Sequence, residues 1–527
     1  MSEDVFPSLI FALELDEGES HAVGKGKLQD PFPVHMGRNL TLKRQPLWVI
    51  GLIAGEQGVC FPNTNLESFG RPVPDRFPLG SLRAEDGGVR ERAMKALFQD
   101  DPSHSAASRE APTEFPEQAP DSPEAQIDRW LASLGLAFDP FRVLDAAADP
   151  RLSQYLVGHQ VLEILWGDWP SLVFAPAGGG KSAFRVWLAH ACRAGWDGRH
   201  IFPIVYALPE RVVQAAPPDR QRSYQETILE AAARELLLTL AYRPERYLDL
   251  PPSQRRRLAS WLAHTLPTPP IHLLAPVQTA QDLSVLGEGY DPTFTMANPP
   301  TARRLQQLKA VLTDVLSTGP SSQPDADSRW QSLHELLTDL LGYRAVYLLL
   351  DGVDAYPETL NRPDRIAEVL APLLHLLRQW NDQAPGAFLK AFLPQEARPW
   401  QERVEGLLTP EPRVAMINWN RSSLLTLLRQ RLLAASQGRF DRLGALGDPG
   451  LYDADERLVD EVRPYPRELL LVAERLFLEH ILRAGPEGRL SSEDLEAALA
   501  WYARQPAGDR GLAEAGGKQD VSKGTSS

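Results

Sequence analysis

The feature that most constrains this chain is the stretch from residue 171 to 182, which reads Ser-Leu-Val-Phe-Ala-Pro-Ala-Gly-Gly-Gly-Lys-Ser. Its three consecutive apolar residues, 172–174, are typical of a strand that is buried on both faces. The small residues after them can bend and can approach a ligand closely, as bulkier residues cannot. Residues 183–192 have helical character. The stretch therefore predicts a strand, a small-residue loop and a helix, in that order.

This order of elements predicts a cradle for phosphate groups, because the loop amides and the helix N-terminus would face the β-phosphate. Lys181 would neutralise charge on the β- and γ-phosphates, and the Ser182 hydroxyl would bind Mg²⁺. The P-loop template has Gly at the first loop position, where this chain has Ala175. The predicted nucleotide-binding residues are Ala175, Pro176, Ala177, Gly178, Gly179, Gly180, Lys181 and Ser182.

The alternative is a strand-to-helix turn in which the Lys is incidental, and residue usage argues against it. The chain has 55 Lys and Arg residues, yet between positions 100 and 517 the only lysines are Lys181, Lys309 and Lys390. In a chain that uses Arg nearly everywhere, Lys at this position indicates a need for a compact ammonium group, since a guanidinium would overfill the loop.

A second chemical element is the apolar run 345–350 followed by Asp351, Gly352, Val353 and Asp354. Such a run predicts a buried parallel strand that delivers a carboxylate at its C-terminal end, where ligands bind in open α/β sheets. We expect Asp351 to be a metal residue together with Ser182. Asp354 would orient or deprotonate the attacking water. For Asp351 alone, the alternative is a strand-end or capping residue.

Composition excludes several classes of protein. At 527 residues the chain is long enough for two or three domains, and its two cysteines, Cys60 and Cys192, exclude a disulfide framework and lack metal-site spacing. We therefore expect a reducing, cytoplasmic location. No apolar run approaches the roughly 20 residues that span a bilayer, so no membrane partner is expected. The net charge of −14 argues against broad nucleic-acid affinity.

The expected fold class is α/β: a P-loop NTPase parallel sheet with a long helical insertion, a C-terminal helical lid and a small N-terminal region. Short apolar runs in the N-terminal region are compatible with a β-rich fold. The linker is rich in Pro, Ser, Ala, Glu and Asp, which favours flexibility. The predicted boundaries are 1–99 for the N-terminal region, 100–124 for the linker, 125–420 for the core, 214–342 for the insertion, 421–504 for the lid and 505–527 for a disordered tail.

Apolar patterns place the remaining elements. Further strands are expected at 201–208, 387–393 and 413–419, and Pro203 favours the start of its strand or a sheet edge. Gln395 is interpreted as a loop residue rather than a γ-phosphate sensor, and the run 255–257, three arginines, as a solvated helix face. Helical patterns lie at 127–134, 152–165, 224–242, 253–266, 302–317, 328–341 and 422–433.

From about residue 125 to 505 the chain resembles the AAA+/STAND class of P-loop ATPases. The sequence from Asp351 to Asp354 is similar to the Walker B form of NACHT-type members. The pair of Pro466 and Arg467 before an apolar helix is similar to the sensor-2 element of AAA+ lids, particularly those of origin-recognition ATPases. The resemblance implies ATP and Mg²⁺ as ligands, with Asp354 and Arg467 in catalytic positions. It also implies that Arg467 reaches the γ-phosphate, and it offers Arg398 or Arg403 as an arginine finger.

Two classes of function follow. The first is an ATP-hydrolysing switch that couples nucleotide state to lid movement and to a protein partner or self-association. The second is an ATP-binding scaffold that does not hydrolyse, which Ala175 and Gly352 favour, because many AAA+ members carry a catalytic Glu at the position of Gly352. A DNA-associated AAA+ ATPase is a further alternative. A GTPase is disfavoured, because neither Lys309 nor Lys390 lies in a guanine-recognition context.

Overall fold

The computed structural model describes residues 122–287, 299–316, 325–404 and 406–505. The expected N-terminal region, nearly all of the expected linker and, apart from residue 505, the expected tail lie outside these residues.

Five parallel strands form one sheet in the order β2-β3-β4-β1-β5. This confirms the predicted parallel α/β sheet. β2 is an edge strand, as the position of Pro203 predicts, because a residue without an N–H is tolerated there. The strands are β1 (Ser171–Ala175), β2 (Ile201–Ala207), β3 (Ala345–Asp351), β4 (Ala387–Pro394) and β5 (Arg413–Met416).

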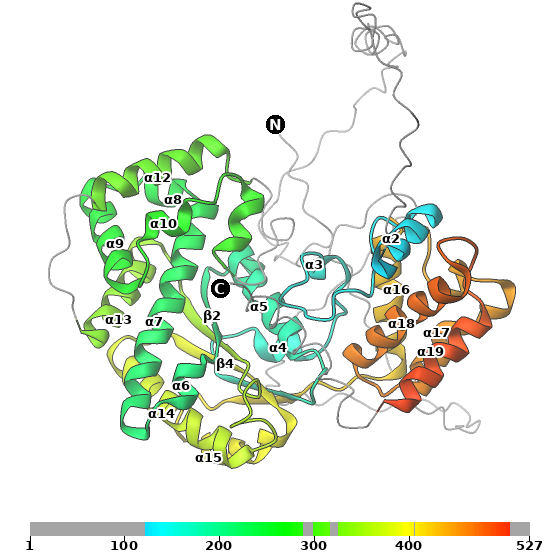
Figure 1. Ribbon diagram of the computed structural model, residues 1–527. Coiled ribbons are helices and arrows are strands. Elements are labelled where there is room, and N and C mark those ends of the chain that lie inside the picture. The colour runs from blue at the N-terminus through cyan, green and yellow to red at the C-terminus, as the bar shows by residue number, and fades with distance from the viewer. Residues whose placement is uncertain (1–121, 288–298, 317–324, 405, 506–527) are drawn as a thin grey trace, which may run out of the picture. The chain divides into compact units, whose positions relative to one another are not determined.

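The described residues include several helices of three turns or more (Figure 1). The long helical region between β2 and β3 is confirmed, and α7, α9 and α13 lie side by side in it. The longer helices are α2 (Pro123–Leu134), α5 (Lys181–Ala194), α7 (Pro217–Tyr242), α9 (Pro252–Thr265), α12 (Ala302–Leu316), α13 (Ala326–Glu335), α14 (Pro363–Gln383), α16 (Arg421–Ala435), α18 (Pro466–Ala484) and α19 (Ser492–Arg504).

Shorter turns of helix connect these elements. They are α3 (Leu152–Tyr155), α4 (Val161–Leu165), η1 (Trp196–Gly198), α6 (Glu210–Gln214), α8 (Glu245–Leu248), α10 (Pro270–Leu274), η2 (Ala280–Val285), η3 (Leu336–Leu340), η4 (Gln395–Trp400), α15 (Gln401–Val404), η5 (Leu443–Leu446), η6 (Pro449–Leu451) and α17 (Ala454–Glu461).

Two predictions of element boundaries were wrong. The apolar stripe 152–165 is not one helix but two, α3 and α4, because Leu156 is extended and the His159 ring accepts a hydrogen bond from the Val161 N–H. The last strand was expected to reach residue 419, but β5 ends at Met416. One more backbone bond, from Ile417 N to Phe174 O, precedes the point where the chain leaves the sheet.

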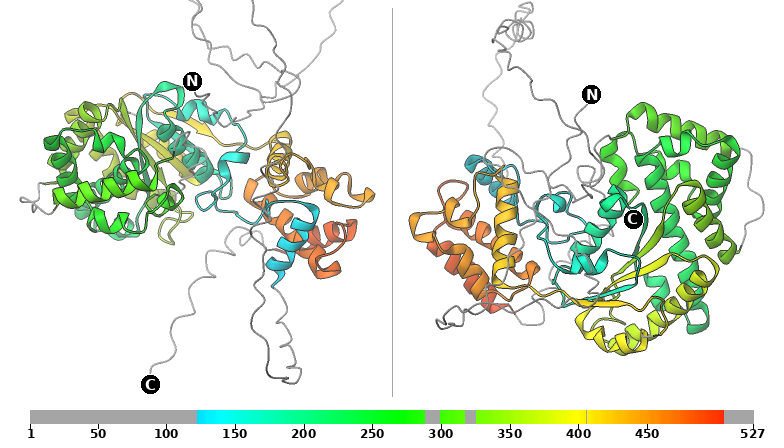
Figure 2. Two further views of the ribbon diagram at one scale, coloured as in Figure 1. Left: turned by 90° about the horizontal axis from the view of Figure 1, so that it is seen from above. Right: turned by 180° about the vertical axis from the view of Figure 1, so that it is seen from behind.

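Alternation along the strands divides the apolar side chains between two cores. Leu172 and Phe174 of β1 belong to the core shared with α7, α9 and α14. Val173 and Ala175 belong to the core shared with α5. A third core joins α2 to the helices α16–α19, which Figure 2 shows grouped together. In it the Trp130 ring meets the Phe477 ring edge-on at 5.2 Å.

One residue of the sheet is a fully buried lysine. Lys390 of β4 is 0% exposed, and its ammonium group donates to the carbonyl oxygens of Gly167 and Trp169 and to Ser171 Oγ. Burial nevertheless lowers the pKa of Lys390 to about 7. Among the described residues, no helix is both long enough and apolar enough to span a bilayer.

Candidate functional site

The sheet places the two sequence motifs together at the carboxyl ends of its parallel strands. β1 ends at Ala175 and β3 ends at Asp351, and both strands run in the same direction with only β4 between them. Neighbouring strands are separated by about 4.8 Å, so these two strand ends lie roughly 10 Å apart. The chain leaves β1 toward β2 on one side, whereas β5 flanks β1 on the other. Such a change of direction is where open α/β sheets bind ligands.

Glycine shapes the loop after β1. Gly178 and Gly180 have φ angles of 75° and 91°, in the left-handed region that a side chain disfavours. Gly180 is the N-cap of α5, so Lys181 is the first residue of that helix. The loop therefore brings the unpaired amides of a 14-residue helix next to its own backbone amides.

Ala175 fits the first loop position because of Gly179. The Ala175 methyl group would lie only 3.1 Å from a Cβ added at Gly179, and Ala175 itself is fully buried. The methyl group thus occupies space that a side chain at 179 would need. The departure from the P-loop template is accommodated within the loop.

Lys181 lies between the two motifs. Its Nζ is 3.2 Å from Asp354 Oδ2 and donates to the carbonyl oxygens of Ala175 and Pro176 at 3.3 and 3.4 Å. Lys181 is 8% exposed. The structure thus brings the lysine after the loop within ion-pair distance of the second carboxylate after β3.

Asp351 has three donors around its carboxylate. Oδ2 accepts from Ser182 Oγ at 2.8 Å and from Arg185 Nε at 3.0 Å, and Oδ1 accepts from the Gly352 N–H at 2.8 Å. The Ser182 and Asp351 pairing is the predicted metal pair. Arg185 was missed by the sequence reasoning. Its spacing offered a signal, because a residue four positions after Lys181 lies on the same face of a helix.

The start of α18 contacts the loop. The Arg467 N–H donates to Gly178 O at 3.3 Å, and the Arg467 Cβ would lie 3.0 Å from a Cβ on Gly178. Pro466 is the first residue of this helix, as predicted. The structure therefore brings the first turn of α18, with Arg467, against the loop after β1.

Three rings gather at the beginning of α5. Trp419 Nε1 donates to Gly179 O at 3.0 Å, and the Trp419 ring stacks on Phe184 at 6.5 Å. His159 lies 5.5 Å from Phe184, and burial lowers its pKa. The sequence reasoning placed Trp419 in a strand and so missed this contact.

The weaker candidates lie elsewhere. Gln395 was interpreted as a loop residue, but it is the first residue of the 3-10 turn η4, where it is exposed. Arg398 is exposed on the same turn, and Arg403 lies 3.8 Å from Asp364. Of the three arginines 255–257, Arg256 and Arg257 are exposed on α9, which agrees with a solvated helix face.

The oxygen atoms available at this site suit a cation whose coordination is completed mostly by water and substrate oxygens. In the described parts of the chain, no cluster of three or more His, Cys, Asp or Glu side chains could hold a metal ion. Ser182 Oγ and the Asp351 carboxylate are two hard oxygen ligands. Mg²⁺ takes such a small set when water and substrate phosphates complete its octahedron.

Comparisons with known proteins give no relative: no protein-family model, no curated protein and no solved structure matches this chain.

Proposed function

We propose that the chain binds ATP with Mg²⁺ at the loop between β1 and α5 and acts as a nucleotide-dependent switch. The observation that carries the proposal is the meeting of Lys181 with Asp354, and of Ser182 with Asp351, at the carboxyl edge of a parallel sheet. No other arrangement on the described chain combines a helix N-terminus, a lysine and two strand-end carboxylates.

Each residue has a role that its contacts support. Lys181 would exchange the Asp354 carboxylate and two carbonyl oxygens for phosphate oxygens, which need a cation more than neutral carbonyls do. Asp354, relieved of Lys181, would then be available to orient a water molecule. Mg²⁺ would supply charge neutralisation of the phosphates, with Ser182 and Asp351 as its protein ligands.

The contact between Gly178 and Arg467 supports the coupling step. Because the Arg467 N–H is bonded to the loop backbone, a rearrangement of the loop changes the first turn of α18. The helices α16–α19 share one core, so that turn is connected to the C-terminal helical region as a whole. In this proposal that region is the lid.

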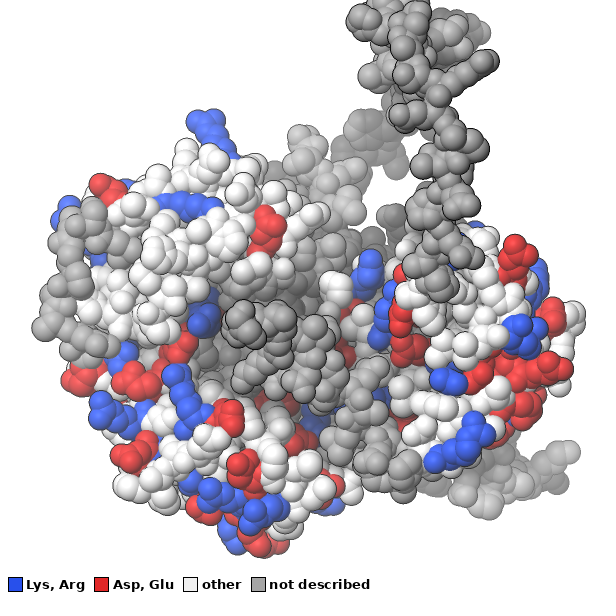
Figure 3. Space-filling model, viewed as in Figure 1, with Lys and Arg blue, Asp and Glu red and all other residues white. Residues whose placement is uncertain are grey.

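ATP is favoured over GTP because guanine recognition would need a lysine other than Lys181, and neither of the two remaining lysines of the described chain is available for it. Lys390 is fully buried, and Lys309 lies on α12 with its Nζ 3.3 Å from Ala275 O. A DNA-binding role receives no support from the face in Figure 3, where acidic and basic side chains are interspersed.

A non-hydrolysing scaffold is the second candidate, and a specific observation favours it. Arg185 donates to the same Asp351 oxygen that faces Ser182, so a guanidinium already neutralises the carboxylate that a metal would use. A weakened metal site would slow hydrolysis while leaving phosphate binding to Lys181 and the loop.

Turnover separates the two candidates. We expect purified protein with Mg²⁺ to bind ATP and to release phosphate, and Asp354→Asn to bind ATP without release. Glu358→Gln, an exposed carboxylate after β3, is the matched control and should leave both unchanged. ATP binding with no phosphate release by wild type would favour the scaffold, and absence of both would refute the proposed function.

A further inference from the structure

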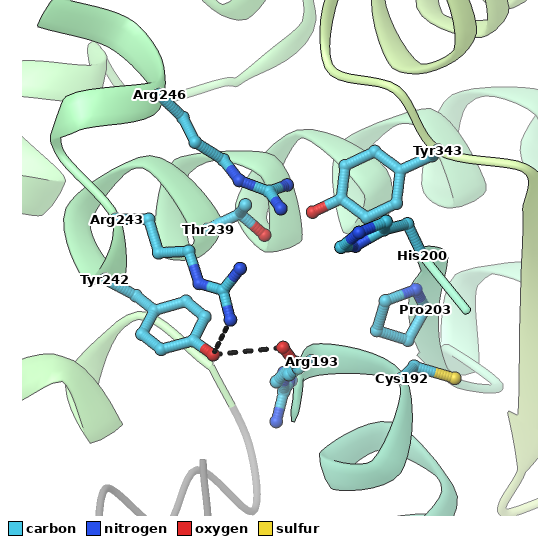
Figure 4. A pocket seen from close by; sticks show the side chains of 9 residues that line it. All are labelled: Cys192, Arg193, His200, Pro203, Thr239, Tyr242, Arg243, Arg246 and Tyr343. Atoms are coloured by element: carbon cyan, nitrogen blue, oxygen red, sulfur yellow. Dashed lines mark hydrogen bonds between the residues drawn. The ribbon is translucent and has the colours of Figure 1, made fainter. Parts of the chain in front are cut away.

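A second concave site lies at the amino ends of strands β2 and β3 (Figure 4). It is lined by the C-terminal end of α5, the beginning of β2, the end of α7, the start of α8 and the residue two positions before β3. The lining residues are Cys192, Arg193, His200, Pro203, Thr239, Tyr242, Arg243, Arg246 and Tyr343.

This pocket is separate from the proposed nucleotide site. Lys181 and Arg193 lie near opposite ends of α5. With a rise of 1.5 Å per residue, twelve residues of helix separate them by about 18 Å. The pocket therefore faces the amino ends of β2 and β3, whereas the loop after β1 faces their carboxyl ends.

One of its three arginines is neutralised. Arg193 donates from Nε and Nη2 to the two oxygens of Glu235, both at 2.7 Å, and both side chains are buried. This bidentate pair forms a neutral part of the wall. The Arg193 carbonyl oxygen accepts from the Tyr242 hydroxyl at 3.0 Å, which fixes that ring beside the pocket.

The other two arginines have aromatic rather than acidic neighbours. Arg243 lies 5.1 Å from the Tyr242 ring and donates to the Tyr242 hydroxyl at 3.3 Å. Arg246 lies 5.2 Å from the Tyr343 ring. Within the described residues, neither is in an ion pair with a carboxylate. A ring face attracts a cation without cancelling its charge, so the pocket carries an excess of two positive charges.

A neighbouring side chain responds to this charge. Burial lowers the pKa of His200, and the charges of Arg246 and Arg243 lower it further. Burial raises the pKa of the Tyr343 hydroxyl, and Arg246, a hydrogen bond with Thr239 and Arg243 oppose that effect. His200, Tyr343 and Thr239 face the space between the guanidinium groups in Figure 4 and supply further hydrogen-bonding groups.

We propose that this pocket, whose free volume of about 10 Å³ admits a single water molecule, opens to bind a phosphate-type oxyanion between Arg243 and Arg246. Two guanidinium forks match the charge of a dianion and can each donate two parallel hydrogen bonds to its oxygens. Both free phosphate and the phosphate group of a small monoester present this chemistry. Binding would connect α8 to the end of α7 and to the segment before β3, and so would stabilise the helical region between β2 and β3.

The test compares inorganic phosphate with sodium chloride at equal ionic strength, by calorimetry and thermal unfolding of the full chain. Wild type should bind phosphate and unfold at a higher temperature with it. Arg243→Gln/Arg246→Gln should bind at least ten-fold more weakly. The control Arg421→Gln/Arg429→Gln removes two exposed arginines of α16 and the same charge, and should behave as wild type.

A third variant keeps this site distinct from the nucleotide site. In Lys181→Ala the phosphate response should persist, because Lys181 is not a pocket residue. Loss of the response in Lys181→Ala with retention in Arg243→Gln/Arg246→Gln would overturn the inference and would assign the phosphate to the loop after β1. Parallel titration with glycerol 3-phosphate distinguishes the two sources, since the tighter ligand identifies the free anion or the monoester.

A second measurement needs no variant. Phenylglyoxal modifies accessible arginines, and mass spectrometry reports each position. Phosphate should protect Arg243 and Arg246 at least several-fold relative to chloride and should not protect Arg421 or Arg429. Equal modification of Arg243 and Arg246 in the two salts would contradict the proposal.

Discussion

Arg185 gives the sharpest prediction about the proposed metal site. Replacing it with Met removes the guanidinium from Asp351 and keeps a side chain of similar length. The two side chains are 3% and 9% exposed, and Arg185 Nε lies 3.0 Å from Asp351 Oδ2. Two unit charges about 4 Å apart attract by roughly 4 kcal/mol at an effective dielectric constant of 20. A metal ion that uses Asp351 competes with this attraction.

Recovery of a third of that energy, about 1.4 kcal/mol, corresponds to a ten-fold change in an equilibrium constant. We therefore expect Arg185→Met to bind a fluorescent ATP analogue at a Mg²⁺ concentration at least ten-fold lower than wild type requires. Affinity in EDTA should change little, because Lys181 and the loop are untouched. Arg185→Lys keeps the charge and should retain the wild-type Mg²⁺ dependence.

Stability is the control for this experiment. Removing one partner of a buried ion pair costs roughly 3–5 kcal/mol, so Arg185→Met should unfold at a lower temperature, and binding is measured below that transition. An identical Mg²⁺ dependence in wild type and Arg185→Met, with nucleotide bound by both, would refute the competition between Arg185 and the metal. Absence of nucleotide binding by wild type would instead refute the proposed function.

Three further predictions concern the core and the loop. Burial lowers the pKa of Lys390 to about 7, so above that pH the unfolded chain binds a proton that the folded chain lacks. The unfolding free energy of wild type should rise relative to Lys390→Met from pH 7.5 to 9.5, by up to about 1.4 kcal/mol per pH unit in urea titrations, and a pH-independent difference would contradict this. Gly178→Ala should destabilise more than Gly438→Ala in thermal unfolding. Both have φ near 80°, but only Gly178 is crowded by Arg467 Cβ, and equal losses would show that the crowding is unimportant. Trp419→Phe keeps a ring but loses the hydrogen bond to the loop, so chemical denaturation should show a loss of about 0.5–1.5 kcal/mol, and an unchanged midpoint would assign that bond no net value.

The strands and the loop could be predicted because their signals are local. A run of apolar residues ending at Asp351 is sufficient to indicate a buried strand, and the glycines before Lys181 are sufficient to indicate a tight loop. Pro203, from its missing N–H alone, indicated the start of a strand or a sheet edge, and β2 is an edge strand. These features depend on residues that are adjacent in the chain.

The contacts that modify the site could not be predicted with the same ease, because they join distant segments. Trp419 reaches the loop 240 positions away. Arg185 is close to Lys181 in sequence, but its partner Asp351 is 166 positions away. The basic pocket has the same origin, since Arg193, Arg243 and Arg246 come from two different segments. Local patterns predicted which elements form, whereas the pairing of charges between them required the structure.

The most direct test of the central claim is equilibrium binding of ATP with Mg²⁺ to wild type, Lys181→Ala and the control Lys309→Ala. The proposal predicts binding by wild type and Lys309→Ala, and an affinity at least ten-fold lower in Lys181→Ala. Equal affinity in all three proteins, or no binding by wild type, would contradict it.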